Sequence, residues 1–194
     1  FDPEILLANQ QRFYDGSTVQ KATAGTHRCA LCDDSGTIFS SIDISRHNCI
    51  DKIAGKALLR GVSLGDKYLL TSGRIPMDMI RKAAALGVPM IVSRSTPTIA
   101  AVETARTANI TLLGFSRENR FNIYSAPQRL RGCTLPIPER SKKRGRRPLF
   151  RIGIRNKAPG DVPCSRAASA ASSGTGSGSR SGPGPPGERG ALRR

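Results

Sequence analysis

The segment that decides the fold is KYLLTSGRIPMDMIRKAAALGVPMIVSRSTPTIAAVETARTANITLLGF, residues 67–115. It contains three short, mostly apolar runs, at 67–71, 89–93 and 110–115. The two stretches between them repeat apolar residues with a helical period, and the second is expected to begin with Thr96 as its cap and Pro97 as its first residue. Strands that alternate with helices imply right-handed crossovers and parallel pairing. The segment therefore predicts a three-layer α/β fold, with a mainly parallel sheet and helices on both of its faces.

The sequence on either side of this segment predicts the remaining elements of one domain. They are a helix over residues 2–16, a hairpin of strands 28–32 and 37–42, a helix from Ser45 to Gly61, and a last strand at 121–124. Asp2 followed by Pro3 is typical of a helix start, and Ser45 is of a residue type that caps helices through its hydroxyl.

Charge divides the chain at Leu130. Residues 1–130 carry 16 basic and 11 acidic side chains, whereas residues 131–194 carry 15 basic and 3 acidic ones. The second part is rich in glycine, proline and serine, so it cannot bury enough apolar surface to offset the entropy of ordering it. We therefore expect one α/β domain at 1–130 and a disordered basic tail at 131–194. No apolar run approaches the roughly 18 residues of a membrane span, and the first residues lack the pattern of a secretory signal.

Polar residues follow each strand of the predicted parallel sheet. They are Ser72-Gly73-Arg74, Ser93-Arg94-Ser95 and residues 114–117, and Arg46-His47-Asn48 opens an earlier helix. The carboxyl ends of parallel strands meet at one edge, where helix N-termini present free N–H groups. Guanidinium groups match phosphate oxygens, and small residues let the backbone approach. This edge is expected to bind a phosphorylated ligand, although each arginine taken alone fits a solvated surface charge equally well.

Five blocks of the sequence resemble the formate dehydrogenase accessory sulfurtransferase family, FdhD. The blocks are Thr23-Ala24-Gly25-Thr26-His27, SRHNCIDK at 45–52, Thr71-Ser72-Gly73-Arg74, Ser95-Thr96-Pro97-Thr98, and Gly114-Phe115 with RFNIY at 120–124. They are similar to the family's T-G-G-T-H turn, its G-R-H-N-A-V-D-K helix start, its S-G-R strand end, its S-A-P-T helix cap and its G-F…R-F-N-V-Y block. Their order and spacing also agree, and the resemblance covers residues 1–130, as the C-terminal part of the family domain.

The resemblance implies a cytoplasmic accessory sulfurtransferase that accepts persulfide sulfur from a cysteine desulfurase. It implies transfer of this sulfur to the molybdenum of the bis(molybdopterin guanine dinucleotide) cofactor of formate dehydrogenase. It also implies a cytidine deaminase-like fold and a homodimer that binds the guanine nucleotide ends of the cofactor. The cofactor-binding residues indicated by the resemblance and by the strand ends are Phe115, Ser116, Arg117, Glu118, Asn119, Arg120, Ser72, Arg74, Arg46 and His47.

The cysteines do not match the family's sulfur-carrying pair. That C-x-x-C lies upstream of the T-G-G-T-H turn, and this chain, which opens on Phe1, is expected to begin too late to include it. Cys29 and Cys32 repeat the spacing, but they lie in a predicted strand, where residues three apart point to opposite faces. They are weak candidates, so we expect no catalytic residue here and impaired sulfur transfer. A zinc site of His27, Cys29 and Cys32 lacks a fourth ligand, so no metal is expected.

The basic tail suggests a different function. Residues 140–147, RSKKRGRR, would suit a nuclear address or contacts with nucleic acid, and a basic nucleic-acid-binding protein that acts through its tail is the main alternative. Against it, the serine, glycine and proline content predicts disorder, with only incidental affinity for polyanions. Cys133 and Cys164 are expected to be exposed in this tail. A zinc hydrolase related to deaminases is a third alternative.

Overall fold

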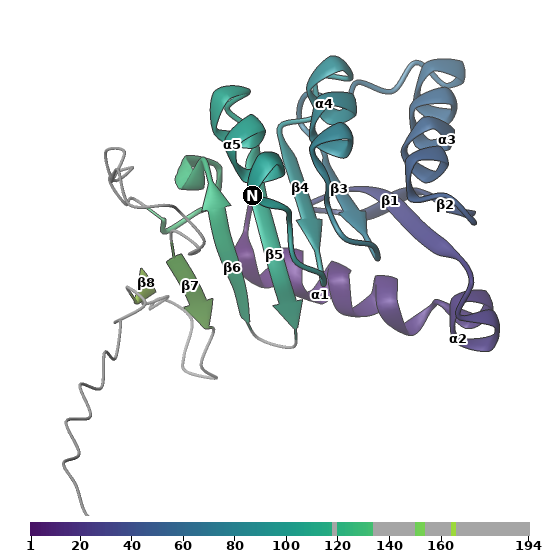
Figure 1. The fold of residues 1–194 in the computed structure, drawn as a ribbon, viewed down its shortest axis with the longest axis horizontal. Helices are drawn as coiled ribbons and strands as arrows, with labels where there is room; N and C mark the ends of the chain where they lie inside the picture. Colours follow the sequence, from purple (N-terminus) through teal and green to yellow (C-terminus); the bar gives the residue numbers. More distant parts are fainter. Residues whose placement is uncertain (118–119, 134–149, 154–163, 166–194) are drawn as a thin grey trace, which may run out of the picture.

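The structure, a computed structural model, describes residues 1–117, 120–133, 150–153 and 164–165. The helices are α1 (Pro3–Asp15), α2 (Thr18–Thr23), α3 (Arg46–Leu59), α4 (Met77–Ala85), α5 (Ile99–Thr107) and the short 3-10 helix η1 (Pro127–Arg129). The strands are β1 (His27–Asp33), β2 (Gly36–Asp43), β3 (Tyr68–Thr71), β4 (Met90–Ser93), β5 (Thr111–Arg117), β6 (Arg120–Ser125), β7 (Phe150–Gly153) and β8 (Cys164–Ser165). α1 covers one face of the sheet, and α3, α4 and α5 cover the other (Figure 1). The three predicted layers are confirmed.

The strands form one mixed sheet in the order β2-β1-β3-β4-β5-β6-β7-β8. The strands β3, β4 and β5 pair in parallel, as the sequence predicts. Antiparallel pairing joins β2/β1, β1/β3, β5/β6, β6/β7 and β7/β8. The prediction of a mainly parallel sheet therefore holds only for the three central strands. The hairpins β1/β2 and β5/β6 explain part of this correction, because a short turn can join only antiparallel neighbours.

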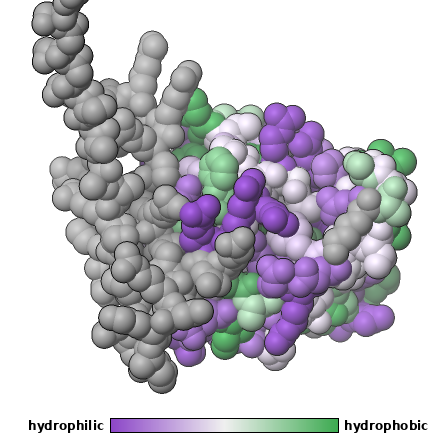
Figure 2. Space-filling model, turned by 90° about the horizontal axis from the view of Figure 1, so that it is seen from below, coloured by the Kyte–Doolittle hydropathy of each residue, from purple (hydrophilic) through white to green (hydrophobic). Residues whose placement is uncertain are grey.

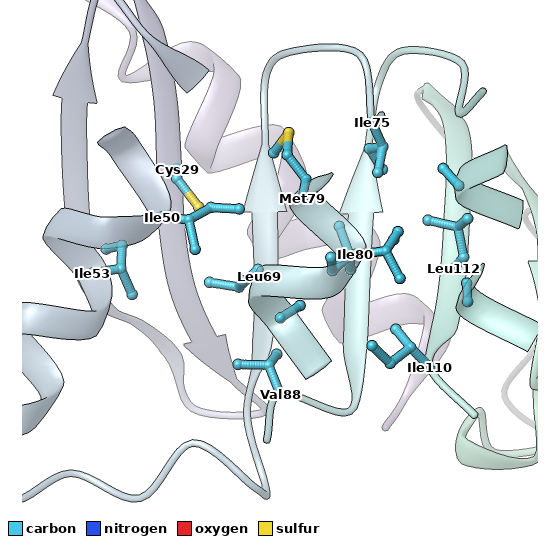
Figure 3. Close-up of a cluster of buried hydrophobic side chains, with 14 of the residues drawn as sticks. Cys29, Ile50, Ile53, Leu69, Ile75, Met79, Ile80, Val88, Ile110 and Leu112 are labelled. Atoms are coloured by element: carbon cyan, nitrogen blue, oxygen red, sulfur yellow. The ribbon is translucent and has the colours of Figure 1, made fainter. Parts of the chain in front are cut away.

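Two apolar clusters bind the layers together. On the α1 face, Leu6 of α1 packs in one cluster with Leu70 of β3. On the opposite face, Ile50 of α3 and Ile80 of α4 share a cluster with Leu69 (Figure 3). Leu69 and Leu70 point to opposite clusters because consecutive strand residues alternate between faces. Every residue of β3 and β4 is buried, which explains why these strands read as uninterrupted apolar runs.

The helix starts agree with the sequence at α1 and differ in detail at α3. The carboxylate of Asp2 accepts hydrogen bonds from the backbone N–H of Glu4 and Ile5, so it caps α1 as predicted. Ser45 occupies the cap position of α3, but its hydroxyl makes no capping bond. The carboxylate of Asp43 instead accepts from the backbone N–H of Ser45 at 2.9 Å. The sequence did not predict α2.

The start of α5 lies two residues beyond its predicted position. Thr98 is the cap, and its hydroxyl accepts from the backbone N–H of Ala101 at 3.1 Å. Pro97 instead forms an isolated parallel bridge with Ile75, so Thr96 and Pro97 continue the strand-like path after β4. The predicted cap at Thr96 is therefore wrong, because pairing with the segment after β3 keeps Pro97 extended.

A few residues beyond Leu130 contact the α/β domain or its sheet, and the predicted disorder of residues 131–194 as a whole stays a prediction. The backbone N–H of Arg131 donates to the carbonyl of Phe1 at 2.9 Å. Cys133 is 3% exposed and belongs to the α1-side cluster, so the expected exposure of this thiol is wrong. β7 and β8 extend the sheet beyond β6. The rest of residues 131–194, with the basic run at 140–147, lies outside the described residues. Among the described residues, none of the helices combines the length and the apolar character that a membrane span needs.

Candidate functional site

The topology brings six chain segments to one edge of the sheet. β2, β3, β4 and β5 end there, and β1 and β6 begin there because they run antiparallel to these neighbours. We call this edge the rim and define it as residues 26–28, 45–47, 72–74, 93–95, 114–117 and Arg120. Figure 2, seen from below the orientation of Figure 1, faces the rim and shows hydrophilic side chains gathered across it.

A chain of hydrogen bonds joins the carboxyl ends of the three parallel strands. The hydroxyl of Ser93 donates to the carbonyl of Gly73 at 2.7 Å and accepts from the backbone N–H of Ser95 at 3.0 Å. The carbonyl of Ser95 in turn accepts from the backbone N–H of Phe115 at 3.3 Å. The turn that holds Ser72 and Arg74 therefore connects through β4 to Phe115, the first of the consecutive predicted cofactor-binding residues at 115–120.

Gly114 lets two of these strand ends approach closely. A β-carbon at this position would lie 3.0 Å from Pro97 Cδ, 3.0 Å from Tyr124 Cε2 and 3.1 Å from the carbonyl oxygen of Ser95. Such distances are shorter than carbon atoms normally reach. Glycine therefore fixes the distance between the segment after β4 and the end of β5.

His27, Arg46 and His47 gather at the β1 end of the rim. A β-carbon on Gly73 would lie 3.1 Å from His27 Nδ1 and 3.6 Å from Arg46 Cβ. Buried side-chain atoms that have no hydrogen-bond partner in the described part of the chain include Thr26 Oγ1, His27 Nδ1 and His47 Nε2. Burial, and then the positive charges of Arg46 and His47, lower the pKa of His27. These surroundings therefore disfavour protonation of the His27 imidazole.

The β5–β6 end of the rim presents an aromatic ring and two guanidinium groups. Phe115 has a left-handed backbone, with φ of 51°, where the register of β5 shifts, and its side chain is 41% exposed. Arg117 and Arg120 pair across the hairpin, and both side chains are exposed. Glu118 and Asn119 lie outside the described residues.

Ser116 turns away from this exposed surface. Its side chain is fully buried, and its hydroxyl donates to the side-chain carbonyl of Gln10 on α1. The amide of Gln10 donates back to the carbonyl of Ser116 at 2.6 Å. Ser116 therefore attaches β5 to α1 and leaves no exposed surface for a ligand, unlike its neighbours Phe115 and Arg117.

Positive charge at the rim has little compensation among the described residues. Arg74, Arg117 and Arg120 are exposed, and in the part of the chain that the structure describes their guanidinium groups form no hydrogen bond or ion pair. The nearby carboxylate of Asp43 is paired with Lys52 at 2.6 Å. Guanidinium groups that lack a protein partner can form paired hydrogen bonds to phosphate oxygens.

The comparisons with known proteins agree on one family. The model of the family described as FdhD/NarQ matches residues 1–131, well over half of the chain. The chain belongs to the FdhD/NarQ family. This confirms the resemblance read from the five sequence blocks.

Relatives within the FdhD/NarQ family include two sulfur carrier proteins FdhD. The one from Bacillus subtilis is 42% identical over 129 residues, which cover 66% of this chain and 49% of the relative. The one from Listeria monocytogenes is 41% identical over 127 residues, again 66% of this chain and 49% of the relative. The chain therefore spans about half the length of these curated relatives.

The crystal structure of a similar protein supports the fold. The protein, from Desulfotalea psychrophila, is named as a formate dehydrogenase accessory protein, and it superimposes with a TM-score of 0.63 at 29% identity. The match covers 67% of this chain and 58% of that one. The predicted likeness to cytidine deaminases stays a prediction.

Cys29 and Cys32 lie on opposite faces of β1. Cys29 belongs to the cluster under α3 and α4, where it contacts the region of Ile50 (Figure 3), and Cys32 belongs to the α1-side cluster. The predicted opposite orientation is confirmed. Burial raises the pKa of Cys29 and raises the pKa of Cys32 to about 11. His27, Cys29 and Cys32 do not converge, and the described residues hold no cluster of three or more metal-ligating side chains.

The sequence did not predict the contact between Tyr14 and Arg94, although it placed Arg94 at the end of a strand. Tyr14 lies on α1, 80 residues from Arg94, yet its hydroxyl accepts from the backbone N–H of Arg94 at 3.0 Å. Periodicity cannot show such a distant contact. The available signal was an aromatic residue at the end of a helix expected to pack on the sheet.

An apolar groove of about 430 Å³ lies away from the rim, toward the C-terminal ends of α3 and α4. Its lining carries no ionisable side chain and consists of Ala54, Gly55, Ala57, Leu58, Val62, Leu64 and Leu86. Its chemistry does not suit a phosphorylated ligand.

Proposed function

We propose that this chain is the cofactor-binding portion of an accessory sulfurtransferase that acts on the molybdenum cofactor of formate dehydrogenase. The substrate is the bis(molybdopterin guanine dinucleotide) form of the cofactor, and its guanine nucleotide ends bind at the rim. The whole protein passes persulfide sulfur from a cysteine desulfurase to the molybdenum. We also propose that it acts in the cytoplasm as a homodimer.

One observation carries the nucleotide part of this proposal. The hydrogen-bond chain from Gly73 through Ser93 and Ser95 to Phe115 places an exposed aromatic ring beside strand ends whose guanidinium groups have no partner among the described residues. A ring can stack on a purine base, and guanidinium groups bind phosphate oxygens. A nucleotide carries its base and its phosphate close together, so the ring and the guanidinium groups must also lie close together.

The residues of the rim fit such a ligand in two further ways. Gly73 and Gly114 pack against neighbouring rim segments without room for a β-carbon, so the strand ends that would contact the ligand are held close to one another. Thr26 Oγ1 and His47 Nε2 are buried without a partner in the described residues, as expected of polar atoms that a ligand or ordered water completes. The relatives named sulfur carrier proteins support the sulfur-transfer part.

The sulfur-carrying thiol is not supplied by the four cysteines whose surroundings are known. Cys29, Cys32, Cys49 and Cys133 are all buried. A sulfur carrier must instead be accessible to its donor and ionise readily. In our proposal these thiols serve packing, and the nucleotide contacts are the contribution of residues 1–131.

Calorimetric titration of GDP into the full chain tests the nucleotide contacts. Replacing Arg117 and Arg120 together by Ala should weaken binding by about 2 kcal/mol or more if these contacts are charge-assisted. The matched control is the Lys56→Ala/Arg60→Ala pair, which removes the same charge from the far half of α3. Equal affinity in the Arg117/Arg120 variant and the unmodified chain would exclude this loop from the site.

Nucleic-acid binding through residues 131–194 stays the alternative. The specific observation in its favour is the excess of basic over acidic side chains in this part, 15 against 3. Titration of duplex DNA separates the two functions. Tight binding that survives the Arg117/Arg120 replacement, with no binding of GDP by the unmodified chain, would favour the alternative.

A further inference from the structure

Arg94 is held on the ring of Tyr14 at the centre of the rim. Its guanidinium carbon lies 5.1 Å from the centroid of that ring, a cation–π distance. Its side chain is exposed, and among the described residues it has no carboxylate partner. The backbone on either side is fixed, because the hydroxyl of Ser93 binds both Gly73 and Ser95.

Tyr14 is itself rigidly placed. Its hydroxyl donates to the carbonyl of Thr71 at 3.0 Å and accepts from the backbone N–H of Arg94 at 3.0 Å, so it bridges the ends of β3 and β4. Its ring meets Phe13 edge-on at 5.2 Å between centroids. Burial raises the pKa of Tyr14 to about 12, so the hydroxyl keeps its proton and can donate well above neutral pH.

The support extends one side chain further. The guanidinium of Arg28 lies 4.8 Å from the Phe13 ring and donates to the carbonyl of Phe13 at 2.6 Å. Arg28, Phe13, Tyr14 and Arg94 thus form a continuous row of contacts at the end of α1, with a guanidinium over each ring and the two rings edge-on. The two ends differ, because Arg28 donates to a carbonyl of the protein, whereas Arg94 is exposed and no described residue accepts a hydrogen bond from its guanidinium.

A fixed guanidinium with free donors suits an anionic ligand. Holding a long side chain in one conformation costs entropy, and a preorganised group loses less of it on binding. The end of β5 lies beside this group, since Phe115 donates its backbone N–H to the carbonyl of Ser95 at 3.3 Å. The exposed ring of Phe115 and the guanidinium of Arg94 therefore stand on neighbouring strand ends, about 5 Å apart at the backbone.

We propose that Arg94 binds the phosphoryl group of the nucleotide whose base lies on Phe115, and that Tyr14 is the positioning residue for Arg94. This inference rests on the nucleotide-binding function proposed above and assigns one of its contacts. Arg117 and Arg120 lie on the other side of Phe115 along the chain, so the phosphoryl groups would meet guanidinium groups from two strand ends.

Comparison of GDP with guanosine tests the assignment. Replacing Arg94 by Gln removes the positive charge and keeps a similar length, so GDP should bind about tenfold or more weakly while guanosine binds as before. Arg94→Lys should retain part of the GDP affinity, because an ammonium keeps the charge but loses the planar fork. The control is Arg60→Gln, which removes a guanidinium that lies 5.2 Å from the Phe39 ring, away from the rim.

Two variants of Tyr14 test its positioning role. Tyr14→Leu removes the ring under Arg94, so it should weaken the binding of GDP and leave the affinity for guanosine unchanged. Tyr14→Phe keeps the ring and removes the bridging hydroxyl. It should therefore lower the melting temperature and leave the ratio of GDP affinity to guanosine affinity nearly unchanged. Melting temperatures measured on each variant show which proteins are folded at the titration temperature.

The outcomes separate this inference from the function on which it rests. An unmodified chain that binds neither GDP nor guanosine overturns both. An unmodified chain that binds GDP, with Arg94→Gln equally tight, overturns the inference alone. An equal loss of affinity for GDP and for guanosine in a folded Arg94→Gln variant also overturns it, because a phosphoryl contact cannot affect a ligand that has no phosphate.

Discussion

The hydroxyl of Ser93 donates a 2.7 Å hydrogen bond to the carbonyl of Gly73, across the gap between two parallel strands where the ladder has ended. The same oxygen accepts from the backbone N–H of Ser95. One side chain, 1% exposed, therefore sets the distance between the Gly73 turn and the segment that carries Arg94. The rim is held by a serine at the end of β4 and not by the sheet alone.

Replacing Ser93 by Ala should lower the free energy of unfolding by about 1–3 kcal/mol, because it leaves the buried carbonyl of Gly73 without its donor. Urea denaturation of the full chain measures the change. Ser63→Ala, at an exposed position, is the control and should stay within about 0.5 kcal/mol of the unmodified chain. A Ser93→Ala protein as stable as this control would mean that the bond contributes nothing to holding the rim.

Much of the fold follows from residues whose environment is local. The strands β3 and β4 could be predicted because each is a short run buried on both faces, and β5 because its first four residues are buried. Asp2 could be predicted as the cap of α1 because it binds only its nearest neighbours. The order of the strands was not readable, since nothing in β1 itself shows that it lies between β2 and β3. Cys133 was missed for a similar reason, because its burial depends on α1 and not on the polar sequence around it.

The site was predictable as an edge but not as a set of contacts. The strand ends at Gly73, Ser95 and Phe115 meet, as parallel strands require. Ser116 faces α1 because Gln10, 106 residues away, binds it there, and no sequence pattern links two such positions. Long-range side-chain contacts of this kind decide which rim residues face a ligand.

Gly114→Ala should destabilise the fold, and Gly55→Ala should not. A β-carbon at 114 would meet Pro97 and Tyr124 at 3.0 Å, so overpacking should cost about 1–3 kcal/mol. Gly55 has nothing within 4 Å of the corresponding position, and alanine in a helix should gain about 0.5–1 kcal/mol. Thermal unfolding followed by circular dichroism compares the two. A melting temperature for Gly114→Ala at or above that of the unmodified chain would contradict the close approach.

His27 should titrate below its ordinary pKa of 6.5, mainly because it is partly desolvated and then because Arg46 and His47 are nearby. The folded protein thus binds this proton less tightly than the unfolded chain. Its contribution to stability is present above pH 6.5 and is lost as the pH falls through the lowered value. Since the sequence has two histidines, proton NMR of the imidazole signals gives the midpoint directly.

Arg46→Gln should raise that midpoint without restoring it fully, because the charge is removed while the burial remains. Arg60→Gln, at the far end of α3, is the control and should leave it unchanged. A midpoint above 6.5 in the unmodified chain would show that His27 is more exposed, or closer to a carboxylate, than the rim geometry allows.

Cys29 and Cys32 should not carry persulfide sulfur. Sulfur transfer needs an accessible thiolate, and burial raises the pKa of Cys32 to about 11, which keeps this thiol protonated at pH 7. Cys29 is fully buried beneath α3, on the other face of the strand, so the two sulfurs cannot exchange with each other.

The measurement is incubation of the full chain with a cysteine desulfurase and radiolabelled cysteine, followed by peptide mapping. The Cys29→Ala/Cys32→Ala variant, if folded by circular dichroism, should show the same label on the remaining cysteines. Stoichiometric label on Cys29 or Cys32, absent from that variant and passed on to the cofactor, would show that β1 opens in solution and that this second C-x-x-C is the sulfur carrier.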